Sequence, residues 1–545
     1  MGNDITPPDT GFTLIKALSE AGAYQHEVTA ISIVETHISW VLLTGPYAYK
    51  IKKPVNFGFL DFSTLEKRRF FCHEELRLNR RLAPELYLDV VPITGNPDQP
   101  KMDGSGEAIE YAVKMIQFPA GCTLSERAEL GQLCSDEIDQ ITGIIADFHE
   151  TVAKADKASP YGGSECIKHW FVENFNHIRA LLVDDKHKQQ LQTIQTWGNQ
   201  EWDSRAGLMQ LRKQQGYVRE CHGDLHLSNM TLINGKVTLF DCIEFNPKLR
   251  WIDVISEVAF LVIDLLHFGY DCYAYRLLNH YLQHTGDYQG IALLRYYLVY
   301  RALVCAKVSL LRRAQQLNDA AISGPASLEY AAFANLAESF TRTGQGALII
   351  THGYSGSGKS TIASQLAEKI GALQIRSDIE RKRLFGYRAQ EHTGSGLDSG
   401  LYTQEAGLKT YRHLAECAKA VIETGFTAII DAAFLKVWQR EMVRQLAVEC
   451  GVKFLIVDFQ ASEEELSRRL RLRQNDASEA TIDVLQHQQQ SAQPLDVEEQ
   501  ADVITINTES DIALEILLDY FDVYLQQLKK PQNQYKISGD FPEIS

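Results

Sequence analysis

Gly353-Tyr-Ser-Gly-Ser-Gly-Lys-Ser360 decides the fold of the second half of this chain. The stretch fits the phosphate-binding loop pattern, Gly-x-x-x-x-Gly-Lys-Ser/Thr, at every fixed position. Residues 347–350 before it are an apolar run typical of a buried strand, and residues 361–370 after it repeat apolar residues every four positions, as a helix face does. Such a strand, turn and helix aim backbone N–H groups and the positive end of the helix dipole at one point, which predicts a polyphosphate site.

The loop itself supplies the predicted nucleotide contacts. Lys359 is expected to reach the β- and γ-phosphates of ATP, and the Ser360 hydroxyl is expected to hold Mg²⁺. The predicted nucleotide-binding set is Gly353, Ser355, Gly356, Ser357, Gly358, Lys359, Ser360 and Thr361. The alternative is a glycine-rich turn that binds nothing, and the match of all fixed positions and both flanks disfavours it.

The composition is that of a globular protein with several domains. The chain has 545 residues, 45% hydrophobic and 23% charged, enough for about two to four domains. The formal net charge of −16 disfavours non-specific binding to nucleic acid or anionic membranes. No apolar run approaches the ~20 residues of a membrane span, and residues 1–8 do not resemble a signal peptide, so we expect a cytoplasmic protein. The cysteines form no Cys-x-x-Cys pair and no zinc-ligand spacing, which predicts free thiols.

The two halves of the chain follow different secondary-structure patterns. Residues 1–340 read as a β-rich lobe with one helix, followed by a mostly helical lobe. The helix at 63–82 has Ser63 as its expected N-cap and Glu66 three residues on, a capping box. After the expected linker, 341–346, strands alternate with helices, which predicts an open, mostly parallel sheet. The expected strands are 347–350, about 372–376, 427–430, 452–457 and 503–506, and residues 529–545 read as a disordered tail.

A second dense stretch, His222-Gly-Asp-Leu-His-Leu-Ser-Asn229, has the residue types that phosphoryl transfer from ATP requires. Asp224 is expected to accept or orient the hydroxyl of the substrate. Asn229 and Asp241 are expected to hold Mg²⁺, with Asp241 at the end of the next β-run. The shared spacing predicts a catalytic loop in the first half of the chain.

This local pattern resembles the catalytic loop of the aminoglycoside phosphotransferase and choline kinase group, relatives of protein kinases. The resemblance implies a phosphate-contacting lysine on a strand, for which Lys50 in Ala48-Tyr-Lys50 fits. Lys52 points to the same side of that strand and stays the rival. The resemblance also implies a glutamate partner on the following helix, where Glu75 fits best and Glu74 is adjacent.

The same resemblance implies two further roles and has two gaps. Residues 114–118 would form the hinge beside the adenine, and Asp253 would brace the catalytic loop. However, no Gly-x-Gly-x-x-Gly turn covers the phosphates, because Glu35-Thr-His-Ile-Ser39 occupies that turn. Cys242 also stands where kinases have Phe after the metal-binding Asp. The sequence therefore leaves open how the first half would hold the phosphates.

The second half contains candidates for metal binding, base catalysis and a lid. Asp431 ends an apolar strand, as in a Walker B motif, and would hold Mg²⁺ or contact substrate. Asp378 follows the second strand, where the small P-loop kinases that this half resembles carry the base that deprotonates the acceptor hydroxyl. Its alternative role is N-cap of the helix at 379–384. Arg469 and Arg473, one helical turn apart, would close on phosphates or adenine as a lid, or else form a solvated face.

Over about residues 25–515 the chain resembles the bacterial family of bifunctional aminoglycoside phosphotransferase/ATP-binding proteins. The order of the halves carries this resemblance, together with the phrases at 60–66 and 81–87. It implies an α+β kinase-like bilobal domain at 1–340 and an α/β P-loop NTPase domain with a mostly parallel sheet at 347–528.

We therefore expect an ATP-dependent phosphotransferase with two Mg-ATP sites, the first of which phosphorylates a small-molecule hydroxyl. The alternative is a regulatory nucleotide-binding protein, with an inactive kinase-like module and a P-loop switch. Acceptor pockets are expected in the segments at about 150–215 and 385–415, and the sequence names neither acceptor.

Overall fold

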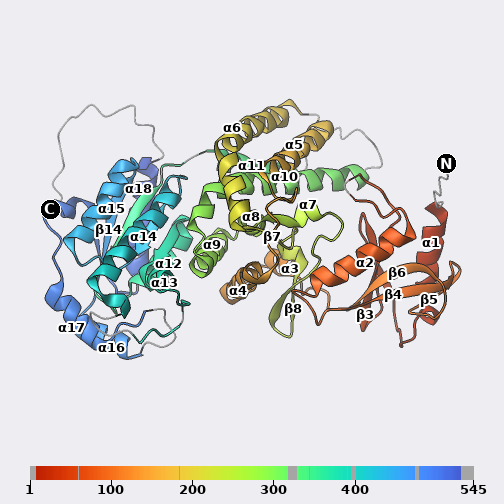
Figure 1. Ribbon diagram of the computed structural model, residues 1–545, viewed down its shortest axis with the longest axis horizontal. Coiled ribbons are helices and arrows are strands. Elements are labelled where there is room, and N and C mark those ends of the chain that lie inside the picture. The colour runs from red at the N-terminus through yellow and green to blue at the C-terminus, as the bar shows by residue number, and fades with distance from the viewer. Residues whose placement is uncertain are drawn as a thin grey trace. The chain divides into compact units, whose positions relative to one another are not determined.

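The computed structural model describes residues 8–58, 60–182, 184–316, 328–342, 344–389, 391–394, 400–472 and 478–528. The chain divides into two compact units (Figure 1). The first comprises Met1–Tyr270 and Leu293–Thr341, and the second comprises Asp271–Ala292 and Arg342–Ser545. Residues 271–292, which the sequence assigns to the first domain, thus group with the second unit. The expected tail at 529–545 lies outside the described residues.

The first unit contains a six-stranded antiparallel sheet with the strand order β1-β2-β3-β6-β4-β5. Its strands are β1 (Ser32–Glu35), β2 (Ser39–Leu43), β3 (Tyr47–Lys52), β4 (Tyr87–Asn96), β5 (Gln99–Met102) and β6 (Ala108–Ile116). On β3, Tyr49 and Ile51 belong to a hydrophobic core. Because side chains alternate along a strand, Lys50 and Lys52 lie on the opposite face. Helix α2 (Leu65–Asn79) packs against β4 and β6.

Two details of this lobe differ from the prediction. The first strand begins at Ser32 rather than at residue 28, and its side chains are exposed. The prediction of Ser63 as N-cap of α2 was wrong: the cap is Thr64, whose hydroxyl accepts a hydrogen bond from the N–H of Lys67. The Ser63 hydroxyl instead donates to the Asp61 carboxylate at 2.6 Å, which removes it from the helix end.

The remainder of the first unit is mostly helical, as predicted. Two short antiparallel ladders interrupt it, β7 (Val218–Glu220) with β10 (Trp251–Asp253) and β8 (Met230–Ile233) with β9 (Lys236–Leu239). Residues 234–235 join β8 to β9 with φ angles of 51° and 76°, the conformation of a tight hairpin turn. The helices are α1 (Pro8–Ala17), α3 (Leu124–Glu129), α4 (Ser135–Thr151), α5 (Ser164–Leu181), α6 (Asp185–Gln215), α7 (Pro247–Arg250), α8 (Val254–His267), most of α10 (Ile291–Gln316) and α11 (Leu328–Thr341).

The second unit is built on a five-stranded parallel sheet with the order β12-β13-β11-β14-β15, which confirms the parallel sheet expected from the sequence. The strands are β11 (Ala347–His352), β12 (Leu373–Arg376), β13 (Ala428–Asp431), β14 (Lys453–Gln460) and β15 (Val503–Asn507). The chain order reverses around β11. In such sheets ligands bind outside the carboxyl ends of the strands at this reversal, so the fold places the predicted phosphate loop at the expected binding edge.

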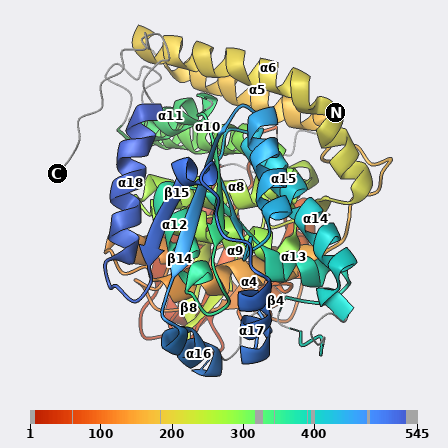
Figure 2. The same cartoon turned by 90° about the vertical axis from the view of Figure 1, so that its left-hand side faces the viewer.

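Helices cover both faces of this sheet (Figure 2). The helices of the unit are α9 (Asp271–Thr285), α12 (Lys359–Ile370), α13 (Ser377–Leu384), α14 (Gln404–Ile422), α15 (Val437–Glu449), α16 (Glu463–Leu472), α17 (Ile482–Ser491) and α18 (Ala513–Leu528). Helix α9 packs against α12 and β12. The Asn279 amide reinforces this contact, since it donates to the Ala372 carbonyl and accepts from the N–H of Gln374. This pairing is what ties residues 271–292 to the second unit.

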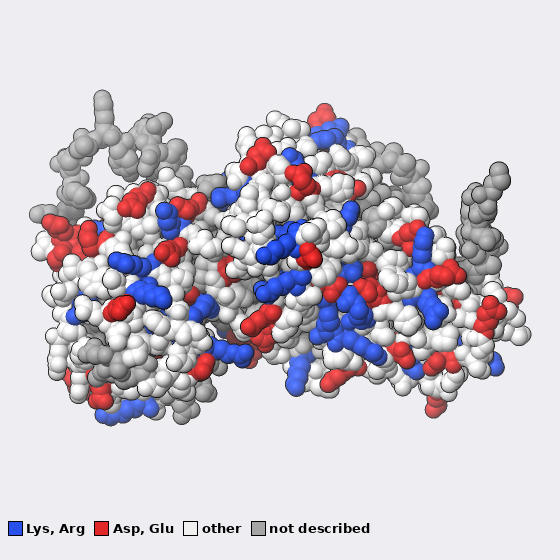
Figure 3. All heavy atoms as spheres, viewed as in Figure 1, with Lys and Arg blue, Asp and Glu red and all other residues white. Residues whose placement is uncertain are grey.

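Two surface properties bear on the expected partners. No helix in the described parts of the chain carries an apolar stretch long enough to cross a membrane. On the face drawn in Figure 3, acidic and basic side chains are interspersed.

Candidate nucleotide-binding sites

The turn between β11 and α12 has a backbone that only glycine accommodates. Gly353, Gly356 and Gly358 have φ angles of 134°, 87° and 82°, a region that other residues rarely adopt. Space is equally restricted, because a Cβ on Gly353 would lie 2.5 Å from the Phe459 carbonyl oxygen and one on Gly356 2.8 Å from that of Leu466. The three glycines thus allow the turn to pass close to its neighbouring backbone.

Only some of the backbone N–H groups of this turn donate hydrogen bonds within the protein. Those of Gly353 and Ser357 donate to the carbonyls of Ala433 and Tyr354, and that of Ser355 donates to the Gln488 side chain. The N–H groups of Gly356 and Gly358 have no acceptor within the described residues. Backbone donors beside a helix N-terminus favour anions, so the turn retains the donors that a phosphate requires.

The next three residues begin α12. The ammonium of Lys359 lies over the turn, where it donates to the Tyr354 carbonyl at 2.6 Å and lies 3.4 Å from the Ser357 hydroxyl. Ser360 follows with its hydroxyl directed at Asp431, and Thr361 is exposed at the third position of the helix. A cation, a hydroxyl and a carboxylate therefore meet at the start of α12.

Asp431 ends β13 and is 4% exposed. Its carboxylate accepts a hydrogen bond from the Gln374 amide at 3.1 Å and lies 3.8 Å from the Arg376 guanidinium. Burial raises the pKa of Asp431, against the lowering effect of Arg376 and of the hydrogen bond from Ser360. The Ser360 and Asp431 oxygens are the hard ligands that Mg²⁺ prefers, and they lie together as the sequence predicts.

Asp378 is the second residue of α13, not its cap. The helix begins at Ser377 with Arg376 at the N-cap position, so the alternative role of Asp378 as N-cap is wrong. The Asp378 side chain is half-buried and has no hydrogen-bond or ion-pair partner among the described residues. Its charge raises the pKa of Asp431, which places it within electrostatic range of the same cluster. An unpaired carboxylate here is suited to accept a proton.

Arg469 on α16 reaches the glycine turn. Its guanidinium donates to the Thr508 hydroxyl at 2.8 Å and to the Thr508 carbonyl at 2.9 Å, and lies 3.5 Å from the Gly356 carbonyl. The solvated-face alternative does not describe this arginine, whose side chain is only 26% exposed. Arg473, the other predicted lid residue, lies outside the described residues.

The first unit contains a second charged cluster, in which two lysines share one glutamate. Lys50 and Lys52 lie 2.9 Å and 2.7 Å from the two oxygens of the fully buried Glu75. Lys50 also pairs with Asp241, and Lys52 with Glu244. Glu75 is thus the shared partner on α2, whereas its rival Glu74 pairs with Arg77 and Arg250.

The side chains of Lys50 and Lys52 differ in their exposure to solvent. The Lys50 side chain is 11% exposed and that of Lys52 1%, so a ligand reaches Lys50 more readily. Burial lowers the pKa of Lys50, but Asp241 and Glu75 outweigh it and raise the pKa well above its usual value. Burial raises the pKa of Glu75, but Lys50 and Lys52 outweigh it and hold the pKa at about 2. All three groups are therefore charged at neutral pH, and the arrangement favours Lys50 as the phosphate contact.

The His222–Asn229 segment lies next to this cluster through Asp241. The Asn229 amide donates to the Asp224 carboxylate at 3.1 Å, and the Asn229 carbonyl accepts from the N–H of Phe240, the residue before Asp241. Asp241 has a φ of 65°, a conformation that costs a non-glycine residue about 1 kcal/mol. Asn229 is therefore bonded directly to Asp224, and it is connected to Asp241 through the backbone hydrogen bond to Phe240.

Asp224 remains ionised in this environment. Burial raises its pKa, but His226, His222 and Arg301 outweigh that effect and hold the pKa at about 2. The His226 ring nitrogen lies 3.3 Å from the Asp224 carboxylate. A carboxylate with so low a pKa is a weak base and orients a hydroxyl by accepting its hydrogen bond.

Several residues that hold this loop were missed by sequence reasoning. Asp253 does not contact the loop as the resemblance implied: it accepts two hydrogen bonds from Arg212 and caps α8. Glu257 instead accepts from the N–H of Gly223 at 2.7 Å and pairs with the buried His149. No local motif marks Glu257, and its position one turn after Asp253 was the available signal.

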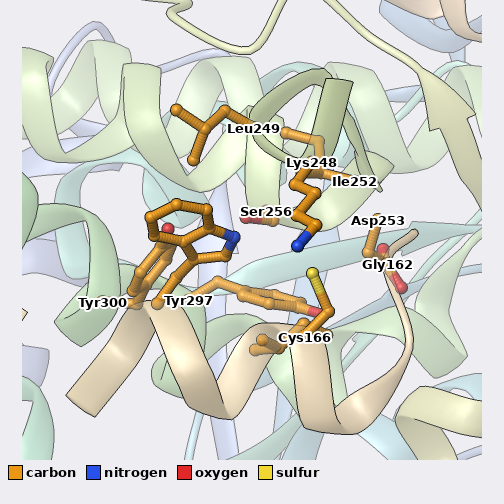
Figure 4. Close-up of a pocket in the computed structure, with 11 residues that line it drawn as sticks. Gly162, Cys166, Lys248, Leu249, Ile252, Asp253, Ser256, Tyr297 and Tyr300 are labelled. Carbon is orange, nitrogen blue, oxygen red and sulfur yellow. The ribbon is translucent and has the colours of Figure 1, made fainter. Parts of the chain in front are cut away.

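The segment expected to bind an acceptor, about 150–215, lines one part of a pocket in the first unit, and residues 248–300 line the rest (Figure 4). Gly162, Cys166 and Trp170 line one side, and Lys248, Ser256 and Tyr297 line others. In Figure 4 the Lys248 ammonium points toward Cys166. Arg301 connects this wall to the catalytic loop, since it donates to the carbonyls of Ser256 at 3.0 Å and Gly223 at 3.4 Å.

Comparison with known proteins identifies the fold of one part of the chain. Residues 348–495 match a family model described as AAA domain. Together with the geometry of the glycine turn, this match supports a P-loop fold for residues 348–495 of the second unit.

Two curated relatives differ in how much they cover. The chain is 29% identical over 454 residues to the uncharacterized protein Rv2004c of Mycobacterium tuberculosis, which covers 83% of this chain and 88% of the relative. This alignment is longer than either unit, so the relative is similar to parts of both. The chain is also 30% identical over 127 residues to a probable adenylyl-sulfate kinase of Aeropyrum pernix, which covers 23% of this chain and 64% of the relative.

Two solved structures each match about a third of the chain. A gluconokinase from Sinorhizobium meliloti is 21% identical and covers 34% of this chain and 99% of its own, with a TM-score of 0.25. The Mycobacterium tuberculosis APS kinase CysC, in complex with AMPPNP and APS, is 16% identical and covers 33% and 99%, also with a TM-score of 0.25.

Replacing Gly353 with alanine tests the glycine turn. The added Cβ meets the Phe459 carbonyl at a φ that alanine resists, and backbone strain of about 1–3 kcal/mol corresponds to roughly 5- to 150-fold weaker ATP binding. Isothermal titration calorimetry measures the effect. Gly407→Ala on α14 is the matched control, because nothing lies within 4 Å of its new Cβ. Unchanged affinity in Gly353→Ala would show that the turn does not grip nucleotide.

A pair of substitutions distinguishes Lys50 from Lys52. Lys50→Met is expected to weaken nucleotide binding by the first unit, while Glu75 keeps its partner Lys52. Lys52→Met is expected to destabilise the unit by about 3–5 kcal/mol, because it leaves Glu244 buried without its counter-ion. Chemical denaturation and calorimetry of both variants check this. The opposite pattern, a stable Lys52→Met that cannot bind nucleotide, would reverse the assignment.

Proposed function

We propose that this protein is an ATP-dependent phosphotransferase with two Mg-ATP sites, one in each unit. The observation that carries the proposal is the convergence around the glycine turn of Lys359, Ser360 and Asp431, with the unpaired carboxylate of Asp378 in the same cluster. These groups supply a phosphate cradle, a cation, a metal-binding pair and a proton acceptor. Phosphoryl transfer requires this combination.

In the second unit, each residue has a proposed task. Ser360 and Asp431 would hold Mg²⁺, which supplies positive charge against the β- and γ-phosphates. Lys359 and Arg469 add positive charge at the turn. The acceptor oxygen forms a bond to the γ-phosphorus as the bond to the bridging oxygen of ADP breaks, and the hydroxyl proton passes to Asp378. The name of the Aeropyrum pernix relative, an adenylyl-sulfate kinase, supports this class of reaction.

In the first unit, the proposal assigns Lys50 to the phosphates, with Glu75 as its partner. Asn229 and Asp241 would hold Mg²⁺ through an amide oxygen and a carboxylate. Because the pKa of Asp224 is about 2, Asp224 orients the acceptor hydroxyl and takes its proton only as the phosphoryl group transfers. The acceptor is a small molecule that carries a hydroxyl group.

One observation favours a regulatory alternative for the first unit. The turn between β1 and β2 contains no glycine and is closed by Thr36, which exchanges hydrogen bonds with Ser39. Such a turn offers fewer free backbone donors to a nucleotide than a glycine-rich loop does. Under this alternative the first unit binds nucleotide without transferring phosphate, and the second unit acts as a switch.

Calorimetric titration with an ATP analogue tests the number of sites. We expect two equivalents in the full chain, one lost in Lys359→Ala and the other in Asp241→Ala, because each substitution removes a phosphate or metal contact from one unit only. The Gly407→Ala protein serves as the control that keeps both. A single equivalent that disappears in Lys359→Ala and persists in Asp241→Ala would refute a nucleotide site in the first unit.

Release of ADP during a screen of hydroxylated metabolites tests catalysis. Asp224→Ala is expected to reduce the turnover stimulated by one class of acceptor, and Asp378→Ala that stimulated by another, each on the order of 100-fold or more. Between pH 5 and 9 the rate of the turnover that depends on Asp224 should not change through titration of this carboxyl, since its pKa of about 2 keeps it ionised. If Asp224→Ala leaves the turnover stimulated by every acceptor unchanged, the regulatory alternative for the first unit is favoured.

A further inference from the structure

Helices α13 and α14 of the second unit bring together three side chains with metal-ligating atoms. Glu380 lies on α13, and His413 and Cys417 lie one turn apart on α14. One ligand atom from each residue lies within 4.8 Å of the other two. The residues are far apart in the sequence and form no recognised spacing, which is why the sequence predicted no zinc site.

The Nε2 atom of His413 faces both of the other candidate ligands. Its Nε2 atom lies 3.1 Å from a Glu380 oxygen and 3.5 Å from the Cys417 sulfur. A neutral imidazole nitrogen either donates one proton or accepts one. A carboxylate oxygen and a thiol sulfur therefore compete for the same ring nitrogen. One cation bound to all three atoms would use the three ligand atoms together.

The spacing of the three atoms suits a small tetrahedral ion. Zinc lies about 2.0–2.1 Å from nitrogen or oxygen ligands and about 2.3 Å from sulfur, which puts neighbouring ligand atoms roughly 3.3–3.6 Å apart. The distances of 3.1 Å and 3.5 Å from His413 Nε2 approach these values without rearrangement of the helices. A mixed set of carboxylate, imidazole and thiol ligands favours zinc over magnesium or calcium.

The partial exposure of His413 gives water access to the cluster, and a neighbouring arginine supports Glu380. Glu380 is 1% exposed and Cys417 is 3% exposed, while the His413 side chain is 28% exposed and admits water. Arg383 pairs with the other oxygen of Glu380. That contact fixes the orientation of the carboxylate, in the way that outer partners commonly orient metal ligands.

A second buried triplet provides a contrast. His149, Cys221 and Glu257 of the first unit also lie within ligand distance of one another. One Glu257 oxygen accepts a hydrogen bond from the backbone N–H of Gly223, so this glutamate already holds the loop, and the other pairs with His149 as Glu380 pairs with His413. All three residues are almost fully buried. This triplet braces the catalytic loop and offers no route for a metal.

We propose that Glu380, His413 and Cys417 form a zinc site with water as the fourth ligand. The cysteine binds as the thiolate, and its proton is released to solvent when the ion enters. The ion joins α13 to α14. Because α13 also carries Asp378 at its amino-terminal end, the site holds in place the helix that presents this carboxylate to the phosphate loop.

Metal content and cobalt substitution test the proposal. Full-length protein without an affinity tag is stripped with a chelator and titrated with zinc, and we expect one tightly bound equivalent. His413→Gln and Cys417→Ser each remove one ligand and are expected to weaken that equivalent at least about 100-fold. Cys450→Ser is the matched control, because Cys450 lies in the same unit and outside the cluster. Circular dichroism establishes that each variant is folded.

Cobalt(II) gives a readout that depends on the sulfur ligand. We expect the thiolate charge-transfer band and the visible bands of a tetrahedral site in the wild-type protein and in Cys450→Ser, and loss of the charge-transfer band in Cys417→Ser. Zinc that binds with equal affinity to folded His413→Gln and Cys417→Ser, or a wild-type cobalt complex without a thiolate band, would overturn the proposal. Absence of any tight zinc equivalent in the wild-type protein would do so as well.

Discussion

The backbone of the turn after β11 is the constraint on which the second site depends. Three glycines with positive φ let this turn approach the Phe459 and Leu466 carbonyls, and the N–H groups of Gly356 and Gly358 have no acceptor among the described residues. Lys359 and Ser360 are placed by that turn, because they are the first residues of the helix it begins. The parallel sheet places the remaining group. Strand β13 ends at the same edge as β11, which brings Asp431 to the Ser360 hydroxyl.

The first unit depends on a different constraint, because it holds several charged side chains away from water. Lys50 and Lys52 share Glu75, and each has a further carboxylate, Asp241 or Glu244. Removing Lys52 leaves Glu244 buried without its counter-ion, and removing Glu75 leaves two buried lysines without their shared partner, so the cluster fixes β3, α2 and the segment after β9 together. The same attraction that stabilises the cluster holds Lys50 at Asp241, and a nucleotide phosphate must compete with that carboxylate for the ammonium.

This difference explains what the sequence could predict. The parallel sheet and the Lys359, Ser360 and Asp431 cluster follow from local patterns, since a turn, a helix start and a strand end each have a sequence signature. Glu75 was chosen over Glu74 from its place on a helix, and packing supports the choice because Glu74 faces Arg77 and Arg250. Other features were not predictable in this way. The cap of α2 depends on the contact between Ser63 and Asp61, and the membership of residues 271–292 depends on hydrogen bonds to residues about ninety positions away.

Positions that act through long-range contacts were the ones missed. Glu257 reaches the Gly223 N–H from another helix, Gln374 reaches Asp431 from a neighbouring strand, and Thr508 holds Arg469 from beyond β15. Each of these residues fixes a residue that the sequence did identify. Motifs therefore mark the groups that would touch phosphate, while the groups that fix their geometry are scattered, because a hydrogen bond to a loop can come from any element that the fold brings near. The two helices that meet at Glu380, His413 and Cys417 follow the same rule.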